Sequence, residues 1–167
     1  MSINNTFEYH GNVRIRKLNT KNKKVLEEFE IKNEGTQSLF TFLCYALIGD
    51  FDQGKMPKYI DASTQSKDSE SIESALSYRS LITSKKINKI GSNISALYTA
   101  TIAKNQLKAN SALKSIYLTN SPSSSDMNDS ILAKIDLTTE VEIADNQALI
   151  IEWDLSFTNT STTATGE

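Results

Sequence analysis

The chain has 167 residues, of which 38% are hydrophobic and 23% charged, and its formal net charge is −2. This length and balance are typical of a single globular domain with one core. A near-neutral chain provides no basic field for a phosphate backbone, so we expect no nucleic-acid partner. The polar N-terminus lacks the layout of a signal peptide, and no apolar run is long enough to cross a bilayer. We therefore expect no membrane partner and synthesis in the cytoplasm.

Reactive side chains are scarce in this sequence. It contains one histidine, His10, and one cysteine, Cys44, which cannot form a disulfide within the chain. Cys44 lies in the apolar run 43–47, where we expect a small buried hydrophobic side chain. We find no glycine-rich phosphate loop and no metal-ligand motif in the sequence. We therefore predict a chain that is not an enzyme, with no catalytic, cofactor-binding or metal-binding residues.

The first strands are predicted by alternation. Residues 12–18 place Val13 and Ile15 on one face and arginines on the other, which is the period of a half-buried strand. Residues 19–23 have turn chemistry, and residues 24–32 alternate again. These segments predict a β-hairpin.

One helix is expected, over residues 36–48. The segment 33–36 (NEGT) supplies its start, a dense apolar run follows, and Gly49 is a suitable stop. Because apolar residues cover more than one face, this helix should be buried on most sides, by the sheets or by a neighbouring subunit.

Strand signals then recur at short spacing. Residues 63–77 and 120–129 are polar and are expected to form loops. The strongest strand, 148–158, places Trp153 among four other apolar side chains on one face and should lie centrally. The other predicted strands are 57–62, 79–90, 93–104, 113–119, 131–137 and 141–143.

This pattern predicts a mainly β fold, an antiparallel β-sandwich with one buried α-helix. We expect a single domain over residues 1–158. Residues 159–167 form a polar C-terminal tail that cannot bury a core and should be loose unless a partner holds it.

The order of these elements resembles a loose group of small virion proteins of tailed bacteriophages. In that group an Asn-x-Gly-x opening, a leucine-rich helix, a Pro-x-Tyr strand and a closing Trp-x-Ile-x-Phe strand recur. The corresponding segments here are 33–36, 39–48, 57–60 and 149–157. The sequence departs from the group at 115–118 (SIYL), which lacks a glutamate and a glycine, and at 62–64, which lacks a glycine. The resemblance implies a β-sandwich subunit of a tail, neck or baseplate, without catalytic residues.

Four sets of residues suggest possible sites, and each also has a structural explanation. Asp50, Asp52 and Asp61 suggest calcium, but the spacing does not fit an EF-hand loop and favours a turn. His10 has no nucleophile placed by a recognisable motif, and is expected to be exposed. Two groups remain. Carboxylates for glycoside hydrolysis could come from Glu140, Glu142, Glu152 and Asp154, but alternation places Glu152 and Asp154 on the outward face of a strand, where charges normally lie. A sugar platform could come from Tyr9, Tyr59, Tyr78, Tyr98 and Tyr117, although tyrosines in strands more often lie between core and surface.

The leading hypothesis is a structural subunit of a bacteriophage virion, in the tail, neck, collar or baseplate. It would act by contacts with other copies, in a symmetric assembly such as a ring, and with other virion proteins, through segments 2–9, 63–78 and 158–167. The alternatives are a carbohydrate- or receptor-binding module at a tail tip, a head-decoration protein, and a small hydrolase. A glycan is therefore a possible ligand, and the virion is the expected location.

Overall fold

The computed structural model describes residues 3–36, 39–41, 43–44, 56–64, 78–90, 93–104, 112–120 and 131–163. The strands within this part of the chain are β1 (Ile3–Asn19), β2 (Val25–Gly35), β3 (Tyr59–Ser63), β4 (Tyr78–Leu81), β5 (Ser84–Ile90), β6 (Asn93–Ala103), β7 (Leu113–Thr119), β8 (Ile131–Val141) and β9 (Gln147–Thr163).

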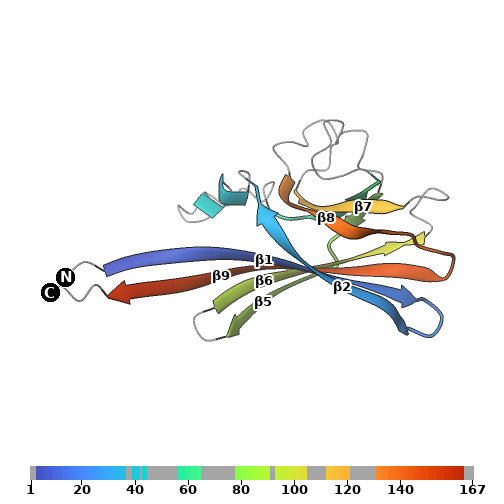
Figure 1. Cartoon of the computed structure of the whole chain (residues 1–167), viewed down its shortest axis with the longest axis horizontal. Helices are drawn as coiled ribbons and strands as arrows, with labels where there is room; N and C mark the ends of the chain where they lie inside the picture. Colours follow the sequence, from blue (N-terminus) through green and yellow to red (C-terminus); the bar gives the residue numbers. More distant parts are fainter. Residues whose placement is uncertain are drawn as a thin grey trace.

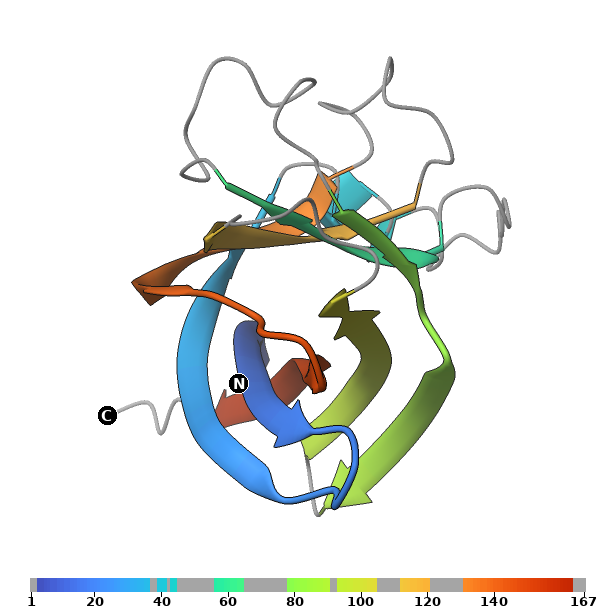
Figure 2. The ribbon, with the colours of Figure 1, turned by 90° about the vertical axis from the view of Figure 1, so that its right-hand side faces the viewer.

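The strands form two antiparallel sheets, as expected for a β-sandwich. The first sheet has the order β2-β1-β9-β6-β5, and the second contains β4, β3, β7 and β8. Strand β2 belongs to both, because its residues 25–33 pair with β1 and its last two residues pair with β8. Figure 2 shows the second sheet lying across the first, with β2 on one side and the β4–β5 segment on the other.

The hydrophobic core lies between the sheets and follows the predicted alternation. Val13 and Ile15 of β1 are fully buried, whereas Arg14 between them is exposed. The inward side chains of the second sheet, such as Ile60 and Ile116, complete the same cluster. The first sheet therefore has one apolar face toward the core and one polar face away from it.

Strand β9 occupies the central position predicted for it. It pairs with β1 over its whole length and with β6 from Ala148 to Thr158. Trp153 is fully buried, and Leu149, Ile151 and Leu155 are buried on the same face. The strand extends further than predicted, because residues 159–163, the first part of the expected loose tail, pair with residues 3–7 of the same chain.

The predicted helix is present but is less buried than expected. Thr36 starts it: the Leu39 N–H donates to the Thr36 carbonyl at 3.1 Å and lies 3.4 Å from the Thr36 hydroxyl. Of the residues described as helical, Leu39 is fully buried, but Phe40 is 44% exposed and Cys44 is also exposed. The prediction of a buried Cys44 is therefore wrong, because the described part of this helix buries Leu39 and leaves the side that carries Phe40 and Cys44 exposed.

Two other strand boundaries differ from the sequence prediction. Segment 79–90 divides into β4 and β5, because the chain leaves β3 there and crosses toward β6; the Thr83 N–H donates to the Thr99 carbonyl at 2.8 Å. Segments 131–137 and 141–143 are not separate strands, since β8 runs without a break to Val141. The loops predicted at 63–77 and 120–129 fall almost entirely outside the described residues.

No helix among the described residues is long and apolar enough to cross a membrane.

Candidate functional site

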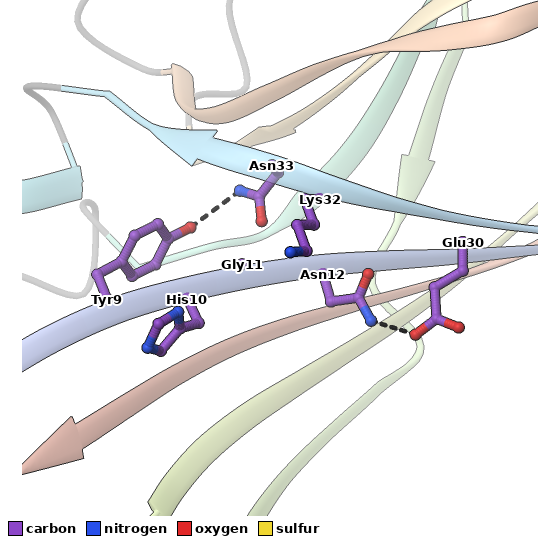
Figure 3. Close-up of a pocket in the computed structure, with 7 residues that line it drawn as sticks. All are labelled: Tyr9, His10, Gly11, Asn12, Glu30, Lys32 and Asn33. Carbon is purple, nitrogen blue, oxygen red and sulfur yellow. Dashed lines mark hydrogen bonds between the residues drawn. The ribbon is translucent and has the colours of Figure 1, made fainter.

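The clearest hollow in the described structure lies where β2 separates from β1. The two strands pair from Leu18 back to Gly11, which faces Asn33, and β2 then turns toward the second sheet. This divergence, which we call the fork, leaves a cavity of about 500 Å³. Its lining comes from both strands (Figure 3): Tyr9, His10, Gly11, Asn12, Glu30, Lys32 and Asn33.

Asn33 is the most buried polar residue of the fork, with 9% of its surface exposed. Its side-chain Nδ2 donates to the Tyr9 hydroxyl oxygen at 2.9 Å, as Figure 3 shows. Its Oδ1 is buried and finds no donor among the described residues. Burial raises the pKa of Tyr9 to about 12, and the hydrogen bond from Asn33 only partly offsets that increase. Tyr9 is therefore a neutral hydroxyl at physiological pH.

The outer rim of the fork carries polar and charged groups. The Asn12 Nδ2 donates to Glu30 Oε1, and both side chains lie on the polar face of the sheet. His10 and Lys32 are exposed beside them. Hydroxyl, amide and charged groups around a concave site are suited to hydrogen-bonding a polar ligand. No serine or cysteine is among the described residues that line this cavity. Ser156 of β9 pairs with His10, and its hydroxyl donates to the His10 carbonyl at 3.0 Å.

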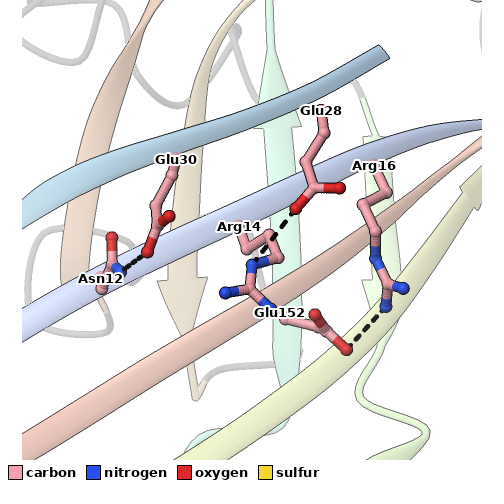
Figure 4. Close-up of polar contacts among 6 residues, drawn as sticks. All are labelled: Asn12, Arg14, Arg16, Glu28, Glu30 and Glu152. Carbon is pink, nitrogen blue, oxygen red and sulfur yellow. Dashed lines mark hydrogen bonds and ion pairs between the residues drawn. The ribbon is translucent and has the colours of Figure 1, made fainter. Parts of the chain in front are cut away.

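Ion pairs continue along the polar face of the first sheet (Figure 4). Arg16 donates to Glu152 of β9 at 2.8 Å, and Arg14 lies 3.5 Å from Glu28 of β2. A second hollow of about 250 Å³ adjoins the fork and shares Asn12 and Glu30 with it. Because these side chains pair across neighbouring strands, their first role is to fix the register of the sheet.

The second sheet contains a buried ion pair that the sequence analysis did not identify. Asp61 is fully buried and accepts two hydrogen bonds from Arg79, at 3.0 and 3.1 Å, and one from the Thr119 hydroxyl at 2.7 Å. The Arg79 guanidinium also lies 4.5 Å from the centre of the Tyr59 ring. Burial raises the pKa of Asp61, and the bonds from Arg79 and Thr119 act in the opposite direction. This arrangement joins β3, β4 and β7.

The structure separates the predicted acidic candidates. Asp50 and Asp52 lie outside the described residues, and Asp61 is engaged by Arg79. Glu152 lies on the outward face of β9, as predicted, and is paired with Arg16. Glu140 is 2.9 Å from Lys114, on the other sheet. The residues that the structure describes contain no group of three or more histidine, cysteine or acidic side chains able to hold a metal ion.

The five tyrosines do not form one exposed platform. Tyr78 and Tyr117 are buried, and Tyr98 is largely buried, which raises its pKa. Tyr9 is part of the fork and contacts Phe40 and Phe157, with ring centroids 6.1 and 5.6 Å apart. A sugar platform built from exposed tyrosines is therefore not present in this arrangement.

Several strand edges carry no partner strand in the described structure. The first sheet ends at residues 25–33 of β2 on one side and at β5 on the other. Residues 3–7 pair only with residues 159–163, since β2 leaves β1 at Gly11 and β6 leaves β9 at Thr158. We call this two-stranded extension the β1–β9 ribbon; Figure 1 shows it projecting beyond the second sheet. It contains parts of two segments that were predicted as contacts, 2–9 and 158–167.

Comparison with protein-family models, with curated protein sequences and with solved structures finds no match for this chain. The site must therefore be judged from its own geometry. Sequence reasoning missed Gly11 and Asn33, although a glycine inside an alternating strand is a signal of close approach by another group.

Proposed function

We propose that this chain is a non-enzymatic structural subunit of a bacteriophage virion that acts through contacts with other copies and other virion proteins. The virion assignment, to the tail, neck, collar or baseplate, rests on the resemblance of the sequence. The mode of action rests on the β1–β9 ribbon, which is the observation that carries the proposal.

The ribbon is suited to assembly because of its backbone. Five residues of β1 and five of β9 pair with each other only, so each strand has one edge of unpaired N–H and C=O groups in the described structure. An isolated two-stranded ribbon is marginally stable in water, and open edges add further strands readily. A neighbouring chain that pairs with either edge satisfies these groups and stiffens the ribbon.

The experiment compares assembly of the full chain with a variant that lacks residues 1–7 and 159–167. The matched control lacks residues 164–167 alone and keeps every described ribbon pair. We expect the full chain and the control to form discrete multimers, measured by light scattering and negative-stain imaging, and the ribbon deletion to lose them. Thermal unfolding checks that the deleted variant remains folded. Multimers of unchanged size from a folded ribbon deletion would refute the role of the ribbon.

A carbohydrate-binding module is the second candidate, favoured by the fork rather than by the tyrosines. The fork combines a cavity of about 500 Å³ with the Asn33 amide, the Tyr9 hydroxyl and the exposed Lys32. A glycan array tests it with the full chain and with Lys32→Ala, and the control Lys21→Ala removes an exposed lysine from the β1–β2 turn. Binding that is lost only in Lys32→Ala would support this function. Absence of glycan binding by the full chain would exclude it.

A further inference from the structure

The two lateral edges of the first sheet carry opposite charge. On β2, the exposed side chains include Glu27, Glu28 and Glu30, against one lysine, Lys32. We call residues 25–33 the acidic edge. On β5, which we call the basic edge, the exposed charged side chains are Lys85, Lys86 and Lys89.

Both edges also expose apolar side chains. Ile87, at the middle of the basic edge, is 80% exposed, and Leu26 on the acidic edge is 42% exposed. When another strand covers an exposed isoleucine on an edge strand, the free energy of the assembly falls, because apolar surface is removed from water. Within the part of the chain that the structure describes, the two edges therefore combine backbone without a partner strand, exposed apolar surface and complementary charge.

We infer that the acidic edge of one copy pairs with the basic edge of the next copy, so that the first sheets join head to tail. This inference rests on the proposed structural function and names the partner as a second copy of this chain. The contact is heterologous, because two different edges meet, and repeating it gives a closed ring or an open filament according to the rotation between copies.

The topology sets the direction of the strands at this junction. Four successive antiparallel pairings separate β2 from β5, so the two strands run in the same direction. Copies that keep one orientation therefore meet through a parallel pair of strands. The seven residues of β5 limit its length.

The existing ion pairs are compatible with this junction. Glu28 lies 3.5 Å from Arg14 and Glu27 lies 3.4 Å from Lys17, both on β1. A neighbouring β5 would place Lys86 on the face that carries Glu28, and Lys85 and Lys89 on the face that carries Glu27, because side chains alternate along each strand. Exposed charge pairs contribute little individually and are screened by salt, so the assembly should weaken as ionic strength rises.

The test uses two charge-reversal variants of the full chain. One carries Lys86→Glu and Lys89→Glu, and the other carries Glu28→Lys and Glu30→Lys. Each variant alone has two edges of like charge, whereas in an equimolar mixture every junction between unlike copies is complementary. The control, Lys21→Glu with Lys24→Glu, makes the same change of net charge as the first variant, but in the β1–β2 turn.

Light scattering over a range of concentrations, with native mass spectrometry of the mixture, gives the readout. We expect the concentration needed for half-assembly to rise about 10-fold or more in each variant alone and to recover in the mixture, with the two variants alternating. Assembly of either variant at the wild-type concentration, or no recovery in the mixture, would overturn the edge pairing.

The wild-type measurement separates the two proposals. Wild-type multimers with no charge effect would refute only the edge pairing, and the ribbon deletion would still test the structural role. A wild-type chain that remains monomeric at all concentrations refutes edge pairing between copies. The proposed structural function would be refuted by a second result, namely that the monomeric chain also binds no other virion protein.

Discussion

The side chain of Asn33 lies directly over the α-carbon of Gly11, at the point where β2 separates from β1. A β-carbon at Gly11 would be 1.5 Å from Asn33 Oδ1 and 2.6 Å from the Tyr9 hydroxyl oxygen. Glycine is therefore required by the close approach of the amide. This contact lies where the two strands begin to separate, and there the Asn33 amide donates to the Tyr9 hydroxyl.

We predict that Gly11→Ala lowers the free energy of unfolding by about 1–3 kcal/mol, because the added methyl group displaces Asn33. Asn33→Ala in the same chain should recover part of this loss, since it removes the two nearest clashing atoms, Asn33 Oδ1 and Cγ, but leaves the Tyr9 hydroxyl. Urea denaturation of the two single variants and the double variant measures the coupling. Equal losses in Gly11→Ala and in the double variant would show that Asn33 is not the obstacle.

The raised pKa of Tyr9 predicts a dependence of stability on alkaline pH. A tyrosine of the unfolded chain ionises near pH 10, whereas Tyr9 in the folded chain keeps its proton to about pH 12. The folded state therefore binds more protons in this window, and its stability falls as the pH rises from 10 to 12. Tyr9→Phe should reduce that slope and leave the pH dependence between 7 and 9 unchanged. Unfolding free energies measured at intervals from pH 7 to 12 test this, and an unchanged slope would contradict it.

Asp61→Asn should be strongly destabilising because it leaves the Arg79 guanidinium without a counter-charge beside a fully buried side chain. We expect a loss of about 3 kcal/mol, the lower end for a broken buried pair, since Arg79 is partly exposed. Adding Arg79→Met should recover part of the loss. The control is Arg14→Gln, which breaks a pair that is half exposed on both sides and should lose less than about 1 kcal/mol. Equal losses of unfolding free energy in Asp61→Asn and the control would contradict the expectation that the buried pair contributes more to stability than the exposed one.

Substitutions of Trp153 measure how much the centre of the core contributes to the free energy of unfolding. Trp153→Ala should lower the free energy of unfolding by about 3–5 kcal/mol, because the residue is fully buried on the central strand β9. Its Nε1 has no acceptor among the described residues. Trp153→Phe removes this unpaired donor while it keeps an aromatic ring, so its loss should be smaller, about 1–2 kcal/mol. A phenylalanine variant as unstable as the alanine variant would show that the shape of the indole dominates.

Local patterns in the sequence predicted the individual strands well where one face is buried. Val13 and Ile15 point inward as their alternation indicated, and the helix begins at Thr36 as its capping chemistry indicated. The same reasoning failed for Cys44, because an apolar run does not say how many sides of a helix are covered. It also did not identify the buried pair of Asp61 with Arg79, since that pair joins two strands that are 18 residues apart in the chain.

Near neighbours along the chain were enough to predict most of the strands, their apolar faces and the turn at residues 19–23, because strand alternation and turn chemistry are local. The pairing of Ile3 with Thr163, the division of β2 between two sheets and the close approach of Asn33 to Gly11 became apparent in the folded structure alone. These contacts join residues far apart in the chain. Their selection depends on how whole faces and edges pack together, which no local period encodes.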